Sequence, residues 1–344
     1  MNIEFSPYTF ARVSVMKSTL LKKIHYDRML KMKISEITKF LEEMGYSKEI
    51  NEFGIELEGA DLIETSISRN LGSTLEKLYN ISNDEMKIVM SKYLGRKDIW
   101  NVKTIIRGKY SGLEPHEIKK LIVPVGLIKK NNIESLIQLE SVEDVLRNID
   151  IIDIKLFKPA IDYYDTTNSL LMIENTLDQF YFADLIEFLK SVPESISLFR
   201  DFLLMEIDIL NIKNMIKLKR AKQSEKQIKA QLFYCGLKLN KKILDKLLKA
   251  KDINGLIGML ADGPYKKIIE PFYKEKINLL DLEVAMDNYL LSKARFMPHV
   301  SPLSVNGLLG YMFAKEIEIK NIHMIVRAKQ LDIGEKFIVE HLIA

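Results

Sequence analysis

The sequence predicts an all-α protein made of three homologous helical repeats that close about a pseudo-threefold axis into a funnel or cup. Apolar residues recur at helical spacing, and the alternating pattern of strands is scarce. One stretch, here called the signature, occurs three times, at residues 98–109, 208–219 and 318–329. The chain also stops soon after the last matched apolar positions, without the polar cap of an open solenoid, which favours closure.

The three signatures align without a gap on Asn101, Asn211 and Asn321, spaced evenly (211 − 101 = 110 and 321 − 211 = 110). Each copy has an acid three residues before its Asn and Arg or Lys six and eight residues after it. Self-similarity at a fixed period indicates internal triplication. We therefore expect three similar domains: residues 1–125, which include an N-terminal extension, 126–235 and 236–344.

In the first repeat, a helix within the first 23 residues precedes one that ends near Gly45. The stretch 82–85 reads as a capping box with Ser82 as the N-cap, because its hydroxyl can accept from the third backbone N–H and Glu85 can reach back. It should start the helix that carries the first signature. A turn at Gly112 and a helix start at Pro115 follow.

In the second repeat we expect an opening helix over residues 142–149 and a long helix over residues 163–190. A break at Pro193 separates the long helix from the second signature. In the third repeat Pro298 and Pro302 should break the chain before the third signature, because proline disrupts a helix interior.

Each signature helix has one apolar stripe that should face the core. The acid and the Asn border this stripe, where burial would be costly without hydrogen bonds. Two interpretations stay open: these groups are internal struts, or they line a central cavity that binds a partner. The candidate partner-binding residues are Asp98, Asn101, Asp208, Asn211, Glu318 and Asn321.

Other signature positions receive separate expectations. Basic residues two and six positions after each Asn, such as Lys103 and Arg107, should lie on a solvated face. A partner without threefold symmetry would be recognised where the copies differ. These positions are Trp100, Leu210 and Lys320, one residue before each Asn, and Arg96, Glu206 and Glu316, five before it.

Composition excludes several classes of protein. A net charge of +4 from 51 basic and 47 acidic residues gives no field of the size that nucleic-acid binding needs. The single cysteine, Cys235, can form no internal disulfide. No signal-peptide pattern opens the chain, and no apolar run is long enough to span a bilayer. We expect membrane association only through a partner.

No recognisable catalytic or ligand-binding motif is present. The sequence lacks the phosphate-binding, dinucleotide-binding, zinc-protease and serine-hydrolase motifs, and its histidines have no metal-ligand spacing. We therefore expect no catalytic residues, no metal and no cofactor. A triplicated helical frame without catalytic groups is most simply a scaffold or a coupling part.

Several further stretches are distinctive: residues 8–13 and 17–21, the Glu-x-x-x-Asp pattern at Glu174 and Glu283, and residues 315–322. In these stretches the chain resembles the C subunit of archaeal-type rotary ATPases, a family that includes the d subunit of the vacuolar proton pump. The resemblance extends over essentially the whole chain, including the three-repeat plan.

The resemblance implies a non-catalytic, funnel-shaped subunit that couples the central stalk to the membrane rotor ring. It would be peripheral, on the cytoplasmic side of the cell membrane, and would take part in proton or sodium transport without binding nucleic acid. The alternative is a cytosolic helical-repeat adaptor or a nucleic-acid-binding scaffold.

Overall fold

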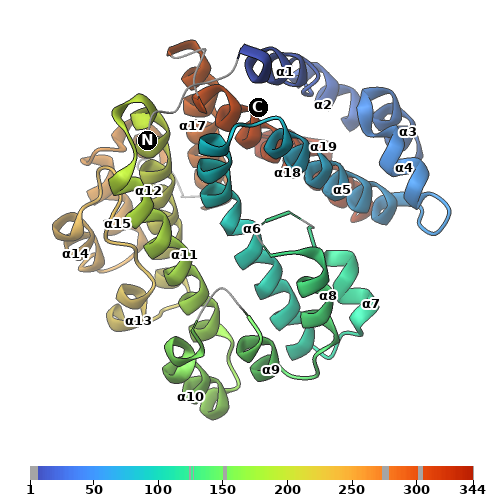
Figure 1. The fold of residues 1–344 in the computed structure, drawn as a ribbon. Helices are drawn as coiled ribbons and strands as arrows, with labels where there is room; N and C mark the ends of the chain where they lie inside the picture. Colours follow the sequence, from blue (N-terminus) through green and yellow to red (C-terminus); the bar gives the residue numbers. More distant parts are fainter. Residues whose placement is uncertain are drawn as a thin grey trace. The chain divides into compact units, whose positions relative to one another are not determined.

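The computed structural model describes residues 7–123, 125–126, 128–149, 153–272, 279–300 and 305–343. Within these residues the chain forms nineteen α-helices and short π and 3₁₀ segments, and no strand (Figure 1). The prediction of an all-α protein is confirmed. The chain divides into two compact units: unit 1 holds residues 1–63 and 192–344, and unit 2 holds residues 64–191.

Unit 2 is built on two long helices, α6 (Asp84–Tyr110) and α11 (Leu171–Ser191), which pack against each other. Helix α6 carries the first signature, and its apolar stripe is buried. Shorter helices extend the unit, and the larger part of α5 belongs to it: α5 (Gly59–Asn80), α7 (Pro115–Leu121), α8 (Lys130–Gln138), α9 (Val142–Arg147), η2 (Ile154–Phe157) and α10 (Lys158–Thr167).

Unit 1 contains the second and third signatures, on α12 (Ser197–Arg220) and α18 (Val305–Gln330). Helix α17 (Leu279–Val300) packs against both of them. The shorter segments between α12 and the chain end are η3 (Glu194–Ile196), α13 (Glu225–Ala230), α14 (Lys241–Leu248), α15 (Ile253–Ala261), α16 (Lys266–Ile269), η4 (Glu270–Phe272) and α19 (Glu335–His341).

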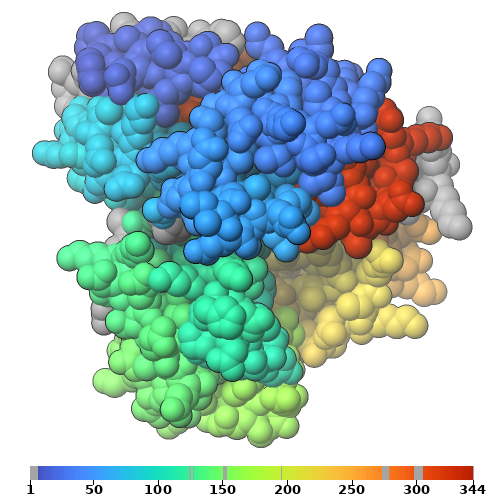
Figure 2. All heavy atoms as spheres, turned by 90° about the vertical axis from the view of Figure 1, so that its right-hand side faces the viewer, coloured from blue at the N-terminus to red at the C-terminus, as the bar shows by residue number. Residues whose placement is uncertain are grey.

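The N-terminal segment of unit 1 packs on the C-terminal signature helix. Helices α1, α2 and α3 all contact α18, and Figure 2 shows the N-terminal residues (blue) against the C-terminal ones (red). The segment holds four helices and one π turn, which joins α3 to α4. They are α1 (Pro7–Ser18), α2 (Lys23–Leu30), α3 (Ile34–Leu41), η1 (Glu42–Tyr46) and α4 (Ser47–Phe53). The chain turns within η1 at Gly45, whose φ of 95° suits glycine.

All three signature helices end in the same left-handed turn. Gly112, Lys222 and Asp332 have φ values of 69°, 54° and 53°. In each turn the following residue donates its N–H to a carbonyl five residues back, which is the Schellman pattern of helix ends. The spacing of these turns repeats the spacing of the asparagines, so the triplication extends to backbone conformation.

The boundaries of the two compact units are set by which long helices pack together, and they differ from the boundaries of the sequence repeats. Each of the first two signature helices packs against the long helix of the next repeat, α6 against α11 and α12 against α17. Elements of successive repeats therefore share one core. The predicted domains 1–125, 126–235 and 236–344 and their closure into a cup stay predictions.

Several local predictions are corrected. The N-cap of α6 is Asn83, whose side chain accepts from Met86 N–H at 2.9 Å, whereas the hydroxyl of Ser82 donates to Leu78 O at 2.7 Å. The helix expected over residues 163–190 is interrupted at Asn168, whose left-handed φ of 49° ends α10. Helix α17 runs to Val300, past Pro298, and Pro302 lies outside the described residues.

Candidate functional site

The three signature asparagines make the same pair of hydrogen bonds. Each side-chain amide donates to the carbonyl, and each side-chain oxygen accepts from the N–H, of the residue 22 positions further on. The distances are 2.6 and 3.0 Å for Asn101 with Val123, 2.7 and 2.9 Å for Asn211 with Phe233, and 2.6 and 3.0 Å for Asn321 with Ile343. Each Asn side chain thus supplies the hydrogen-bond partners that the backbone of this later residue would otherwise lack.

The first two signature acids hold the next few residues of the same loop. Asp98 Oδ1 accepts from Ile128 N–H at 3.0 Å. Asp208 accepts from Lys238 N–H at 2.7 Å, from Leu239 N–H at 3.1 Å and from the Tyr265 hydroxyl at 2.7 Å. Burial raises the pKa of Asp208 above its ordinary value, although these three donors favour the ionised form.

A repeated glycine makes these contacts possible. An added Cβ would lie 1.9 Å from Asp98 Oδ1 at Gly126 and 1.7 Å from Asp208 Oδ1 at Gly236. No side chain fits at such distances, so only glycine lets the loop approach the carboxylate. The repetition of Gly126 at Gly236 in the sequence thus has a direct physical cause.

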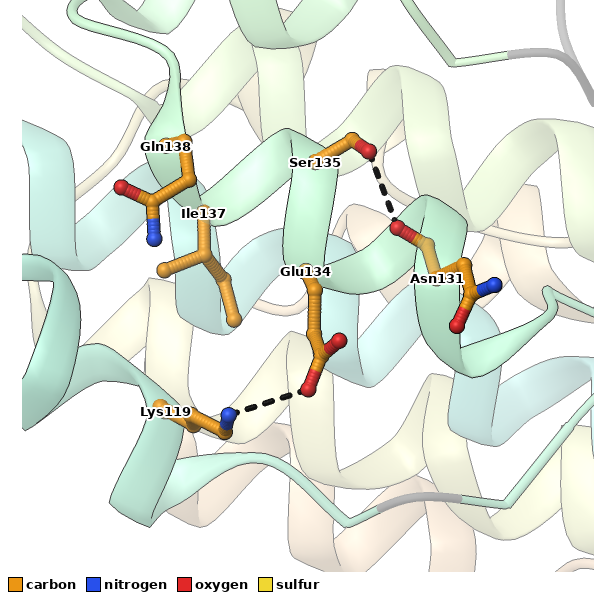
Figure 3. Close-up of a pocket in the computed structure, with 6 residues that line it drawn as sticks. All are labelled: Lys119, Asn131, Glu134, Ser135, Ile137 and Gln138. Carbon is orange, nitrogen blue, oxygen red and sulfur yellow. Dashed lines mark hydrogen bonds and ion pairs between the residues drawn. The ribbon is translucent and has the colours of Figure 1, made fainter.

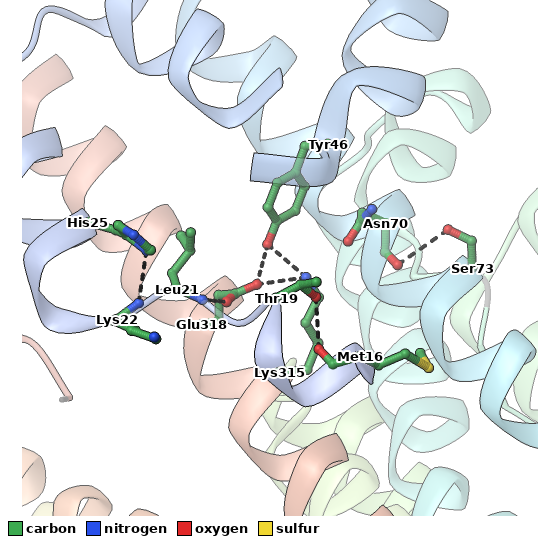
Figure 4. Close-up of polar contacts among 10 residues, drawn as sticks. All are labelled: Met16, Thr19, Leu21, Lys22, His25, Tyr46, Asn70, Ser73, Lys315 and Glu318. Carbon is green, nitrogen blue, oxygen red and sulfur yellow. Dashed lines mark hydrogen bonds and ion pairs between the residues drawn. The ribbon is translucent and has the colours of Figure 1, made fainter. Parts of the chain in front are cut away.

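Glu318, the third signature acid, receives its donors from the N-terminal segment. The Leu21 N–H donates to Oε2, and the Tyr46 hydroxyl donates to Oε1 at 2.6 Å (Figure 4). Lys315 Nζ lies 2.7 Å from the same Oε1 and 2.9 Å from the Tyr46 oxygen. The carboxylate is therefore both paired with a cation and hydrogen-bonded, as a buried charge requires. Burial, and then the charge of Glu318, raises the pKa of Tyr46.

The same segment reproduces the second repeat in a further contact. Lys219 Nζ donates to Leu248 O, at the end of α14, at 2.9 Å. Lys329 Nζ donates to Leu30 O, at the end of α2, at 2.5 Å. A lysine at a helix C-terminus satisfies carbonyls that have no partner in the helix. Helix α2 therefore makes the same contact with the third signature helix that α14 makes with the second.

All six candidate residues lie in the interior. Their exposed fractions are 3% or less. The hydrogen bonds described above bind them to their own chain, which favours the internal-strut interpretation. Their participation in partner binding stays a prediction. Lys315, Tyr46 and Tyr265 were not expected at these acids, although the two tyrosines lie nearly two repeat periods apart (265 − 46 = 219), a spacing that could have indicated them.

Four of the basic residues expected on a solvated face, two in each unit, pair with the long helix of the next repeat. In unit 2, Lys103 lies 2.5 Å from Asp178, and Arg107 Nε lies 2.6 Å from Glu174. In unit 1, Lys213 lies 2.5 Å from Asp287, and Lys217 lies 3.3 Å from Glu283. The expectation was wrong for Lys103 and Lys213, which a second helix partly covers, whereas Arg107 and Lys217 are exposed as expected.

Asp287 has an additional partner. Lys320 of α18 lies 2.5 Å from its second oxygen, so α17 is ion-paired to both signature helices of unit 1. Burial alone would raise the pKa of Asp287, but the two lysines outweigh it and hold the pKa below its ordinary value. At the matching Asp178, burial outweighs the single Lys103 and the pKa is raised.

The positions where the repeats differ are more accessible. Trp100 is 54% exposed, an unusual position for a large aromatic side chain. Lys320 is exposed, and Leu210, Arg96, Glu206 and Glu316 are partly buried. These positions offer side chains to a partner more readily than the six buried residues do.

The described residues show no metal centre and no bilayer-spanning helix. No cluster of three or more His, Cys, Asp or Glu suited to a metal occurs among them. No helix in this part of the chain has the length and apolarity to cross a bilayer.

A pocket lies between α7 and α8 in unit 2 (Figure 3). In its wall Lys119 pairs with Glu134 at 3.0 Å, and this pairing lowers the pKa of the Glu134 carboxyl.

Comparisons with known proteins agree on one family. A model of the family described as ATP synthase (C/AC39) subunit matches residues 9–341. The chain is 35% identical to the C subunit of the A-type ATP synthase of Methanococcoides burtonii, over 98% of this chain and 93% of that one. It is 30% identical to the corresponding protein of Methanosarcina mazei (98% and 92%) and 29% identical to that of Haloquadratum walsbyi (95% and 95%).

Proposed function

This chain belongs to the family of ATP synthase (C/AC39) subunits, and on that premise we propose that it is a non-catalytic central-stalk component of an A-type or V-type rotary ATPase. It couples the central stalk to the membrane rotor ring for proton or sodium transport. It is peripheral, on the cytoplasmic side of the cell membrane, and meets the membrane only through partner subunits. The whole-chain match to the C subunits of A-type ATP synthases is the observation that carries this proposal.

The internal contacts support a role in passing torque. A coupling part must resist sliding of one helix along another, and buried hydrogen bonds and ion pairs fix a register because displacement leaves polar groups without partners. Each signature helix has such contacts at its Asn and at its acid. In α6 and α12, Lys103 and Lys213 add ion pairs to a neighbouring long helix.

In this proposal the six candidate residues contribute to partner binding by positioning the loops that they hold. Direct contact falls to exposed positions where the repeats differ, with Trp100 as the first candidate. A central stalk without threefold symmetry cannot contact three equivalent walls in the same way. A few anchoring side chains should dominate such an interface.

The test is co-purification of the tagged chain from the cells that make it, in mild detergent and with nuclease added. The proposal expects rotor-ring and central-stalk subunits in the eluate, in constant ratio and unaffected by nuclease. Recovery of nucleic acid, or of unrelated soluble proteins without ring subunits, would instead support the adaptor or nucleic-acid-binding alternative, which the family match does not favour.

A coupling role also requires a functional readout. ATP-driven ion transport should fall when this subunit is stripped from the complex and should return when purified chain is added back. Unchanged transport in the stripped complex would contradict the coupling role while leaving membership of the complex intact.

A further inference from the structure

Unit 1 contains a cavity of about 420 Å³ where the N-terminal segment meets α17 and α18. Its wall carries four cationic side chains, from three helices and the α1–α2 junction: Lys17, Lys22, Lys23 and Arg295. None of them forms an ion pair with a described residue. Lys22, Lys23 and Arg295 are exposed, so their charges lie at the rim.

The only carboxylate among the described lining residues does not neutralise this rim. Glu318 is 3% exposed, and its oxygens already accept from Leu21 and Tyr46 and pair with Lys315 (Figure 4). The cavity therefore keeps an excess of positive charge at its rim, beside the buried Glu318. Like charges in proximity repel, and an anion between them would remove that repulsion.

We propose that this cavity is a binding site for a phosphate-bearing anion. A phosphate monoester carries close to two negative charges and three acceptor oxygens, which suits several cations better than a carboxylate with one charge. The planar guanidinium of Arg295 matches two phosphate oxygens, and the lysines act as point charges.

A cavity in unit 2 supplies a matched comparison. It also has two adjacent lysines at a helix start, Lys129 and Lys130 of α8, and an arginine from a long helix, Arg69 of α5. It has one cation fewer, and Glu76 lies in the same lining. Substitution of Lys129 and Lys130 removes two positive charges at a helix start, as substitution of Lys22 and Lys23 does. It leaves the unit 1 cavity unchanged.

The test measures binding of inorganic phosphate to the purified full chain by calorimetry, against chloride at equal ionic strength. The variant Lys22→Gln/Lys23→Gln should weaken binding about tenfold or more, and Arg295→Gln should do the same from another helix, because each removes charge-assisted hydrogen bonds. The matched variant Lys129→Gln/Lys130→Gln should change it less than about twofold. Thermal unfolding should show that all variants remain folded.

A second arm identifies the source of the phosphate. Flotation with phosphatidic acid vesicles, whose headgroup is a phosphate monoester, is compared with phosphatidylcholine vesicles. It reports a lipid headgroup if the Lys22/Lys23 variant loses binding and the Lys129/Lys130 variant keeps it. Binding of inorganic phosphate without vesicle binding reports a free anion. The proposal is overturned if neither probe binds, or if both lysine pairs weaken binding equally, since that outcome reports general surface charge. It does not depend on the proposed coupling role.

Discussion

The side-chain amide of Asn211 holds the backbone of Phe233 from both sides, donating to its carbonyl at 2.7 Å and accepting from its N–H at 2.9 Å. Both residues are buried. The same pair of bonds occurs once in each repeat, so a side chain in the middle of each signature helix fixes the segment that follows it. This contact leads directly to a first prediction.

Replacement of Asn211 by alanine should lower the free energy of unfolding by roughly 2 to 4 kcal/mol, because it leaves one buried N–H and one buried carbonyl without partners. Urea denaturation measures the change. Asn214→Ala, on the same helix and half-buried, is the control and should stay within about 0.5 kcal/mol of wild type. Equal effects of the two substitutions would show that the amide bonds contribute nothing specific.

The signature acids give a second prediction. Reversal of charge should prevent stable folding, because each new lysine would place a buried positive charge against the N–H donors that now bind the carboxylate. The triple variant changes Asp98, Asp208 and Glu318 to Lys, and circular dichroism during urea denaturation measures its stability. A fully stable triple variant would contradict the internal-strut interpretation.

A neutral triple variant separates folding from partner binding. Asp98→Asn, Asp208→Asn and Glu318→Gln keep shape and remove charge, so a larger folded fraction is expected than for the reversal. The folded fraction is then tested for binding to purified central-stalk subunits. Normal binding assigns these acids to structure alone, whereas loss of binding with folding intact supports their role at the partner interface.

The third prediction compares Asp287 with Asp178, which occupy matching positions but have opposite pKa shifts. The folded pKa of Asp287 lies below its unfolded value of about 4, so its ionised form stabilises the fold above that pH. This stabilisation is lost as the pH falls through the folded pKa. Asp287→Asn should therefore cost about 2 kcal/mol near pH 7 and progressively less in acid.

For Asp178 the sign is reversed. Its folded pKa is raised, so the folded state binds the proton more tightly, and wild type gains stability relative to Asp178→Asn as the pH falls from the raised pKa towards the unfolded value. The measurement is the difference in unfolding free energy between wild type and each variant from neutral to acid pH. Slopes of the same sign for both variants would contradict the opposite pKa shifts of the two aspartates.

The fourth prediction concerns the left-handed turn at the end of α12. Lys222 has a φ of 54°, where a Cβ is unfavourable, and the matching residue after α6 is Gly112. Lys222→Gly should raise the free energy of unfolding by about 0.5 to 1 kcal/mol. Gly112→Ala should lower it by a similar or larger amount. Destabilisation by Lys222→Gly would mean that the lysine side chain makes a compensating contact.

The sequence by itself determined the helical class, the triplication and the polar residues beside each apolar stripe. These features are local or periodic: helical spacing shows which face is buried, and exact repetition shows that 101, 211 and 321 occupy equivalent places. The contact of each Asn with the residue 22 positions on is local in the same sense. A matched search over that distance could have found it.

Only the tertiary structure decided which groups meet across repeats. Lys103 and Lys213 were expected in solvent because helical periodicity describes one helix and not the neighbour that covers its other face. Glu318 and Leu21 are 297 residues apart, so their contact joins the two ends of the chain. Their contact arises because the N-terminal segment packs on α18 and brings an N–H and a hydroxyl to a buried carboxylate, whose burial is costly without such donors.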